Sequence, residues 1–350
     1  MGNTEKSKSK ALIFIILAIV AVVAYWGYTM AHKYYAVKVL KVELDETAYI
    51  YITPQDSAAS VIAKIAQAAP GAHTEGFAAL AAHNNYDSRK RSGKYAIKNG
   101  DTMSNIYNRI VSRQQTPVRV TIPSTRDTRQ AIGIISRQIM ADSASLAEYT
   151  HPVAMSCFGY EAAAIPAFFI PDTYEVYWDI SAQEFFEKMA SWNRQYWNEN
   201  RKAKAKAIGL TPTQVSTLAS IVDEETANTA EMPIVAGLYI NRLKRGIPLQ
   251  ADPTVKFALG DPTRRRILNK DLEVNSPYNT YKHNGLPPGP IRIPTKQALE
   301  SVLNYTKHNY IYMCAKEDFS GTHNFAKTLS EHNANAKRYQ QALNKLNIKK

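Results

Sequence analysis

The segment Leu218-Ala219-Ser220-Ile221-Val222-Asp223-Glu224-Glu225-Thr226 places three consecutive acids at the end of an apolar run. The residues just before it predict the start of a helix. Thr211 has the side chain of an N-cap, Pro212 suits the first turn, and Gln214 completes a Thr-x-x-Gln capping box. The sequence therefore predicts a helix that begins near residue 212 and carries the acids in its last turn.

The spacing of the apolar residues predicts which acid faces the protein. One face of this helix is formed by apolar side chains: Val215, Leu218, Ala219, Ile221 and Val222. At about 100° per residue, Glu225 lies roughly 50° from the centre of that face, Asp223 roughly 110° and Glu224 roughly 150°. We predict that Glu225 faces the interior and Glu224 faces water. The alternative without a functional role is that all three acids form a solvated helix face, which is the commoner role of an acidic triplet.

Four motifs further along the chain favour a functional role of these acids over a solvated helix face. In order, they are Leu249-Gln250-Ala251-Asp252-Pro253-Thr254-Val255, Ser276-Pro277-Tyr278-Asn279-Thr280-Tyr281, Gly285-Leu286-Pro287-Pro288-Gly289-Pro290-Ile291 and Gly321-Thr322-His323-Asn324-Phe325. In this order and spacing the set resembles the endolytic murein transglycosylases, the MltG/YceG-like family. Weaker similarity extends back through Pro171-Asp172-Thr173-Tyr174 and Gly93-Lys94-Tyr95.

The resemblance implies a catalytic residue. The family's helix motif reads approximately Ala-Ser-Ile-Val-Glu-x-Glu-Thr, and its second Glu is catalytic; that position is Glu225 here, in agreement with the helical face. This chain carries Asp223 at the first acid, where the family has Glu. The resemblance also implies an α+β fold: an N-terminal transmembrane helix, a small LysM-like α+β domain and a larger α+β catalytic domain. Whether the LysM-like domain binds glycan stays open.

The implied reaction is lytic cleavage of the MurNAc–GlcNAc β-1,4 bond in nascent peptidoglycan strands. A half-buried Glu favours its neutral form and can protonate the leaving oxygen. The C6 hydroxyl of N-acetylmuramic acid is then the nucleophile, so the product carries a 1,6-anhydro end and strand elongation would terminate. This chemistry needs no cofactor. The implied partners are peptidoglycan glycan strands and, as a candidate class, peptidoglycan synthases.

Asp252 is predicted to bind substrate. It is also the main candidate for a second carboxylate, which would make the protein a hydrolysing muramidase. Its alternative role is to cap a turn in Asp-Pro-Thr. Six further residues are predicted to bind substrate through amide, phenol or imidazole groups: Gln250, Tyr278, Asn279, Tyr281, His323 and Asn324. The amides and phenols could instead hold loop backbone. A non-catalytic glycan-binding scaffold is the alternative outside enzymes.

The N-terminus predicts a membrane anchor. The stretch from Ala11 to Met30 has no charged residue and is long enough to cross a bilayer. Lys6, Lys8 and Lys10 precede it, so the positive-inside rule places residues 1–10 in the cytoplasm and the rest outside the inner membrane. A cleaved signal peptide is the alternative, but the apolar run is long and no clear cleavage site follows.

We predict the remaining organisation from local patterns. The expected parts are a linker or emerging strand at 31–45, the LysM-like domain at 46–116 and the catalytic domain at 117–346. Strands are expected at 49–53, 93–97, 118–123 and 310–315. Helices are expected after Ser57, after Thr102, and at 129–140, 182–201, 233–245 and 331–346. Residues 249–295 read as a long irregular loop that forms a cleft wall.

Charge and cysteine content exclude other classes. The formal charge is +13 over 350 residues, with a run at Arg264-Arg265-Arg266 and a basic tail ending in Lys349 and Lys350. No nucleic-acid-binding module accompanies it, so anionic lipids or glycan peptides are the expected partners. No His-Glu-x-x-His or Cys-x-x-Cys motif is present, so no metal is expected. Cys157 and Cys314 could pair, but two buried thiols are the favoured prediction.

Overall fold

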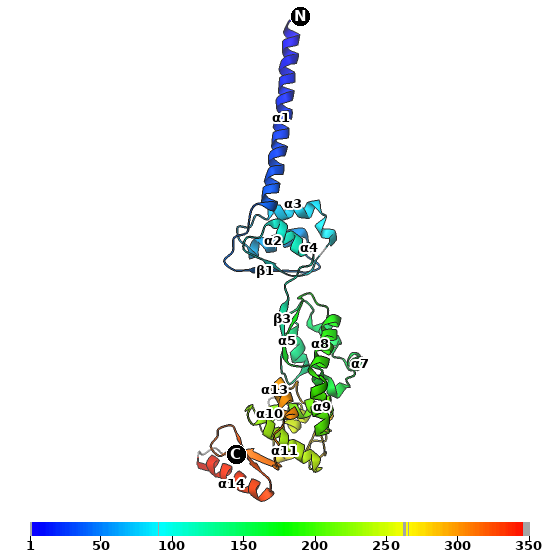
Figure 1. Cartoon of the computed structure of the whole chain (residues 1–350), viewed down its shortest axis with the longest axis vertical. Coiled ribbons are helices and arrows are strands. Elements are labelled where there is room, and N and C mark those ends of the chain that lie inside the picture. The colour runs from blue at the N-terminus through cyan, green and yellow to red at the C-terminus, as the bar shows by residue number, and fades with distance from the viewer. Residues whose placement is uncertain (1, 90, 262–263, 265, 346–350) are drawn as a thin grey trace. The chain divides into compact units, whose positions relative to one another are not determined.

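The computed structural model describes residues 2–89, 91–261, 264 and 266–345, and its elements are labelled in Figure 1. The basic tail at 349–350 and part of the Arg264–Arg266 run lie outside the described residues. The chain is mixed α+β and divides into two compact units. Unit 1 comprises residues 1–118 with 175–179, and unit 2 comprises 119–174 with 180–350. The LysM-like character of residues 46–116 stays a prediction.

Unit 1 is built on one antiparallel strand pair. Its elements are α1 (Gly2–Lys38), β1 (Ala48–Ile52), α2 (Ala58–Ala68), α3 (Glu75–His83), the 3-10 helix η1 (Tyr86–Arg89), β2 (Gly93–Ile97) and α4 (Met103–Val111). β1 pairs with β2, with Ile50 opposite Tyr95. Ser57 and Thr102 cap α2 and α4 as the sequence predicts, each accepting a hydrogen bond from the backbone three residues on.

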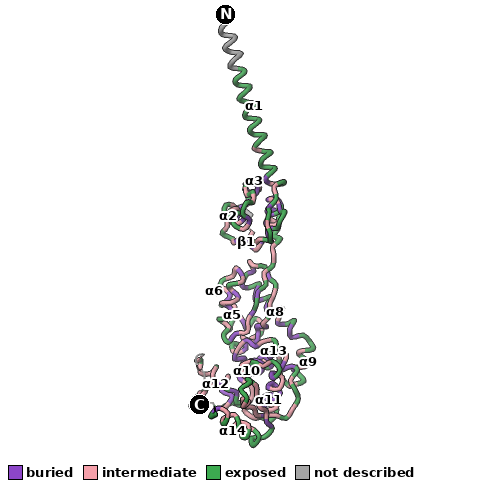
Figure 2. Tube along the Cα trace, turned by 90° about the vertical axis from the view of Figure 1, so that its left-hand side faces the viewer, coloured by how far each residue is buried: buried purple, intermediate pink, exposed green. Residues whose placement is uncertain are grey.

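Helix α1 is long and apolar enough to cross a membrane: the span from Leu12 to Lys38 has 27 residues. Figure 2 shows this helix as exposed along its apolar length. The predicted linker at 31–45 is wrong in its first part, because residues 31–38 continue the helix. Ala36 is fully buried, and Lys38 donates a 3.1 Å hydrogen bond to Ser104 of α4. Contacts between the end of α1 and the rest of unit 1 thus accompany the continuation of the helix beyond its apolar stretch.

From residue 118 onward the chain is mainly helical. Its elements are β3 (Val118–Ile122), α5 (Thr128–Ile135), α6 (Ser143–Glu148), α7 (Pro152–Ser156), η2 (Ala162–Phe168), β4 (Asp172–Val176), α8 (Ala182–Tyr196), α9 (Glu199–Ile208), α10 (Pro212–Glu225), α11 (Met232–Lys244), α12 (Asp252–Leu259), η3 (Asn269–Glu273), α13 (Lys296–Leu303), β5 (Tyr312–Ala315), β6 (His323–Ala326) and α14 (Leu329–Lys345). β3 pairs with β4, and β5 pairs with β6. Helices α10, α11 and α13 pack on one another and form the core that carries the acidic segment.

Several predicted elements differ from the observed ones. The helix expected at 182–201 is two helices, because Asn198 caps α9 with its side chain and interrupts the run. The helix expected at 129–140 ends at Ile135. The region 249–295 contains α12 and η3, so it is not uniformly irregular.

The cysteine prediction is wrong for one residue. Both Cys157 and Cys314 are free thiols, but Cys157 is exposed and Cys314 is only partly buried. Burial raises the pKa of the Cys314 thiol. The prediction of two buried thiols rested on the fact that free cysteines are buried on average. Cys157 is an exception because it lies at the exposed end of the short helix α7.

Candidate active site

Helix α10 begins as the sequence predicts. The Thr211 hydroxyl accepts a 3.2 Å hydrogen bond from the Gln214 backbone, and the Gln214 side chain accepts one of 2.9 Å from the Thr211 backbone. Every residue from 215 to 222 is buried. The Ser220 hydroxyl accepts a 3.0 Å hydrogen bond from the backbone of Ile291, which ties the helix to the Gly285–Ile291 motif. The acids in the last turn are therefore carried by a buried helix that is capped at its start and tied to a neighbouring loop.

Glu225 faces the interior, as predicted from the helical face. The hydroxyl of Tyr239, on α11, donates a 2.6 Å hydrogen bond to Glu225 Oε1. Burial raises the pKa of Glu225 to about 7, the Tyr239 hydrogen bond opposes this, and the negative charges of Asp252 and Glu224 add to it. This carboxyl group can hold a proton near neutral pH.

Glu225 opens into a pocket of about 310 Å³. The pocket is lined by Glu225, Leu238, Tyr239, Arg242, Leu249, Gln250, Asp252, Tyr281, Ile311, Tyr312, Met313 and His332. Four predicted site residues thus meet in one place: Glu225, Gln250, Asp252 and Tyr281. They come from α10, the start of α12 and two separate loops, so the pocket exists only in the folded unit 2.

Asp252 is the second carboxylate in this pocket. It is the first residue of α12, and its Oδ1 accepts a 2.5 Å hydrogen bond from the Tyr281 hydroxyl. The N-cap of α12 is Ala251, so the alternative in which Asp252 caps the turn does not describe this helix start. Burial and the hydrogen bond to Asp252 raise the pKa of Tyr281.

Gln250 is held in a strained conformation beside the two carboxylates. Its φ of 53° is in the left-handed region, which residues other than glycine seldom adopt. The Gln250 side-chain oxygen accepts a hydrogen bond from the guanidinium of Arg242. Because that oxygen is occupied, the Gln250 amide NH₂ is the group with hydrogen bonds left to offer.

Tyr278 and Asn279 lie outside the pocket lining. Asn279 is fully buried, and its amide donates 2.8 Å hydrogen bonds to the carbonyls of Leu272 and Val274. Tyr278 packs with its ring centroid 4.7 Å from that of Phe257. These contacts correspond to the loop-holding alternative, and direct substrate binding by the two residues stays a prediction.

His323 and Asn324 also lie outside the pocket lining. His323 is the first residue of β6. Its backbone N–H and ring Nδ1 lie 2.8 and 3.1 Å from the two carboxylate oxygens of Glu231. Asn324 donates a 2.6 Å hydrogen bond to Glu317. A role of either residue in binding substrate stays a prediction.

The other two acids of the triplet do not face water. Glu224 was expected to be solvated, but its side chain is only 11% exposed. It accepts hydrogen bonds of 2.9 and 2.7 Å from Arg126 and one of 2.8 Å from Arg292. Asp223 accepts 2.9 Å hydrogen bonds from the backbone and hydroxyl of Thr295, the N-cap of α13. Both acids therefore have structural partners, whereas Glu225 alone of the three lines the pocket.

Several pocket residues had no place in the sequence-based site, among them Tyr239, Arg242 and His332. Tyr239 and Arg242 are three residues apart on α11, so they share a helix face. That spacing was a usable signal, since α11 directly follows the helix that bears Glu225. His332, on α14, offered no local signal.

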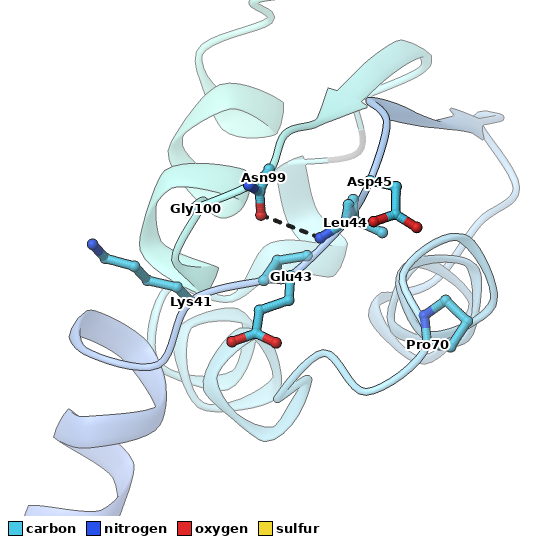
Figure 3. A pocket seen from close by; sticks show the side chains of 8 residues that line it. Lys41, Glu43, Leu44, Asp45, Pro70, Asn99 and Gly100 are labelled. Atoms are coloured by element: carbon cyan, nitrogen blue, oxygen red, sulfur yellow. Dashed lines mark hydrogen bonds between the residues drawn. The ribbon is translucent and has the colours of Figure 1, made fainter.

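Two larger hollows lie elsewhere. One of about 500 Å³ in unit 2 is lined by Arg126, Glu224 and Phe257 among others. One of about 670 Å³ in unit 1 lies between the 41–45 segment, Pro70 and the turn at Asn99 (Figure 3), where Asn99 accepts a hydrogen bond from the Leu44 backbone. Among the described residues, no group of three or more His, Cys, Asp or Glu side chains is placed to hold a metal ion.

These features define a class: an α+β protein with an N-terminal apolar helix and a pocket that holds a protonatable glutamate. Residues 50–338 match the model of the YceG-like family. The chain belongs to the YceG-like family.

Named relatives agree with this assignment. A Bacillus subtilis (strain 168) protein named endolytic murein transglycosylase is 38% identical over 166 residues, which cover 47% of this chain and 45% of that protein. A protein of the same name from Streptococcus pneumoniae serotype 2 (strain D39 / NCTC 7466) is 38% identical over 114 residues, covering 31% and 21%. The matches thus span less than half of the length of these relatives.

A solved structure shares the fold. The 2.6 Å crystal structure of a yceG-like protein from Listeria monocytogenes has a TM-score of 0.53 and 24% sequence identity. It covers 83% of this chain and 99% of that chain.

Proposed function

We propose that this protein is a membrane-anchored murein lytic transglycosylase in which Glu225 is the acid and base. The observation that carries the proposal is Glu225 itself: it opens into a pocket, and burial raises its pKa to about 7. A carboxyl group in that state can donate a proton and take one back near neutral pH. The relatives named endolytic murein transglycosylase support the choice of substrate.

The hydrogen bond from Tyr239 determines which oxygen reacts. Tyr239 donates to Oε1, so the proton of neutral Glu225 resides on Oε2. That proton goes to the glycosidic oxygen as its bond to C1 of N-acetylmuramic acid breaks. The resulting carboxylate takes the proton of the C6 hydroxyl as O6 bonds to C1. No water is consumed, and the products are a GlcNAc end with a free hydroxyl and a 1,6-anhydroMurNAc end.

Asp252 and Gln250 would support this step. The Asp252 carboxylate is close enough to raise the Glu225 pKa, so its charge would also stabilise positive charge that develops at C1. The Gln250 amide NH₂ would donate to an acetamido carbonyl or a sugar hydroxyl. Tyr281 holds Asp252 in place through its hydroxyl.

A hydrolysing muramidase is the second candidate, since Asp252 lines the same pocket as Glu225. In that reaction Asp252 would activate water or form a covalent intermediate. The two reactions can be distinguished by digesting murein with the full chain in detergent, reducing the products with borohydride and measuring their masses. Transglycosylation gives ends that are lighter by one water and cannot be reduced. Reducible N-acetylmuramic acid ends as the main product would reject the transglycosylase.

We also propose that α1 crosses the inner membrane with the N-terminus in the cytoplasm. Its apolar span and the N-terminal lysines support this orientation. Unit 2 and the part of unit 1 that follows α1 would then meet nascent glycan strands outside the membrane, where cleavage would end strand elongation. Peptidoglycan synthases are the expected neighbours at that place, and glycan binding by unit 1 remains part of the same proposal.

A further inference from the structure

The hollow of about 500 Å³ in unit 2 lies beside the Glu225 pocket. Glu225 and Asp252 line the Glu225 pocket, whereas their direct neighbours in the chain, Glu224 and Pro253, line the hollow. Helices α10 and α12, which carry these residues, contact each other. Because neighbouring residues have Cα atoms only about 3.8 Å apart, the two cavities share a border at the end of α10 and the start of α12.

Residues of two sequence motifs that lie outside the Glu225 pocket border this hollow. Ile291, the last residue of the Gly285–Ile291 motif, is part of its lining. Tyr278 of the Ser276–Tyr281 motif packs on Phe257, which lines the hollow and is 40% exposed. The motifs that identify the family thus support both cavities, and not the Glu225 pocket alone.

The lining of the hollow differs in chemistry from that of the Glu225 pocket. Its apolar members are Pro166, Pro253, Phe257 and Ile291. No amide or phenol side chain is among its described lining residues, whereas Tyr239, Gln250 and Tyr281 line the Glu225 pocket. Amides and phenols can both donate to and accept from sugar hydroxyls. The hollow is therefore less suited to a sugar than the Glu225 pocket, and it offers an apolar surface instead.

Lys256 supplies a positive charge at this apolar surface. It lines the hollow and pairs with no acid in the described part of the chain. The acids that line the hollow have other partners: Glu224 forms its two ion pairs, Asp127 accepts a 2.8 Å hydrogen bond at the start of α5, and Asp261 lies 3.9 Å from the guanidinium of Arg264. An unpaired ammonium group in a concave site attracts anions. The hollow thus fits a ligand that brings small apolar groups and a carboxylate.

We propose that this hollow binds the stem peptide of the murein strand, with a peptide carboxylate at Lys256 and alanine methyl groups against Phe257. The inference rests on the proposed function and deepens it. The stem peptide is attached to the lactyl group of the N-acetylmuramic acid whose glycosidic bond breaks at Glu225. An extended peptide advances about 3.3–3.6 Å per residue, so a stem of a few residues can leave the Glu225 pocket and enter the adjacent hollow. The enzyme would then prefer strands that carry their peptides to bare glycan.

A pair of substrates tests this preference. Murein strands without cross-links are assayed with the full chain in detergent, before and after an amidase has removed their peptides. We expect Lys256→Glu to lower kcat/KM on peptide-bearing strands about 10-fold, mostly through KM, and to change kcat/KM on bare strands less than about twofold. Lys256→Gln should lose about threefold on peptide-bearing strands, because it removes the attraction without adding repulsion.

Lys188→Glu is the matched control, since it reverses the same charge on α8, outside the lining of both cavities. It should leave both substrates unaffected, and thermal unfolding of each variant checks the fold. Equal losses on both substrates in the Lys256 variants would overturn the inference, because the hollow would then bind sugar or support the fold. Unchanged kcat/KM on peptide-bearing strands would overturn it as well.

A binding measurement separates this inference from the proposed reaction. In the Glu225→Gln chain, adding Lys256→Glu should weaken the affinity for a murein tetrasaccharide with its stem peptides about 10-fold, and the affinity for the peptide-free tetrasaccharide less than about twofold. Added salt should narrow the 10-fold difference, because it screens the charges. Equal affinities with and without Lys256→Glu would overturn only this inference, whereas reducible product ends would overturn only the transglycosylase proposal.

Discussion

Tyr239 on α11 donates a 2.6 Å hydrogen bond to Glu225 at the end of α10. The two residues are 14 positions apart, and the turn between their helices brings them together at the pocket. The contact opposes the effect of burial on the Glu225 pKa and occupies one of the two carboxylate oxygens. Tyr239 therefore weakens the hold of Glu225 on its proton, against the effects of burial and of the Asp252 and Glu224 charges.

Replacing Glu225 by Gln should abolish murein release, because the amide has nearly the same shape but no proton to give. Substitution should leave the circular dichroism spectrum unchanged. Murein release above about 1% of the wild-type rate in Glu225→Gln would contradict the assignment of Glu225 as the acid.

The same substitution should change stability with pH in a defined direction. The folded protein keeps the Glu225 proton up to about pH 7, whereas the unfolded chain loses it near the ordinary value of 4.5. Between these values the folded state binds more protons, so wild-type stability declines as pH rises through this window. Glu225→Gln removes this decline and should be more stable than wild type at pH 8 by about 3 kcal/mol, but not at pH 4. Urea unfolding at both pH values measures this, and an equal difference at both would contradict it.

Tyr239→Phe should shift the pH dependence of activity upward. The lost hydrogen bond lowers the Glu225 pKa, so its removal raises that pKa and keeps Glu225 protonated to higher pH. The fall in kcat/KM at alkaline pH should move to higher pH, while the rate falls about 3- to 30-fold through poorer positioning. Tyr281→Phe is the matched control, since its hydroxyl bonds to Asp252 instead. A Tyr239→Phe profile that moves to lower pH would refute the argument.

Glu224→Gln should destabilise the protein. The helical-face argument alone would make this substitution neutral, but Glu224 pairs with Arg126 and Arg292 and its side chain is 11% exposed. Loss of the charge leaves Arg126 without its carboxylate partner and Arg292 with Asp223 alone, and should cost about 1–2 kcal/mol of unfolding free energy. Chemical denaturation of the full chain measures the cost. A variant as stable as wild type would show that the ion pairs contribute nothing net.

Asp252→Asn should slow murein release about 10- to 100-fold without changing the product, because its role in transglycosylation is to position and stabilise. Mass spectrometry should still find anhydro ends. Near-complete loss of activity, with reducible ends among the wild-type products, would instead assign Asp252 as the base or nucleophile of a hydrolase.

The orientation of α1 is testable with fusions. A reporter that is active only outside the cytoplasm should be active when fused to the C-terminus, since the lysines before the apolar span favour an N-terminus in the cytoplasm. A reporter that works only in the cytoplasm serves as the opposite control. Activity of that control at the C-terminus would rule out the proposed topology.

Local rules in the sequence were enough to predict α10 and the direction of Glu225. A capping box and a period of 3.6 residues depend on neighbours within one or two turns, and the structure has both as predicted. The spacing of the later motifs identified the family and brought Gln250, Asp252 and Tyr281 into consideration. Three of the substrate-binding residues predicted from those motifs line the pocket, because their loops converge on the buried end of α10.

Only the tertiary structure decided the surroundings of the triplet. The helical wheel places Glu224 on the polar face, but Arg126 and Arg292, which are 98 and 68 residues away in the chain, cover that face. His332 lines the pocket from α14, more than 100 positions after Glu225 in the chain. Helix α14 packs on β5 and β6, a strand pair whose register the local sequence pattern did not specify. Periodicity records which side of a helix is apolar. Which distant charge or ring lies against the other sides depends on how the chain packs, and that arrangement makes one of three adjacent acids a proton donor and the other two structural anchors.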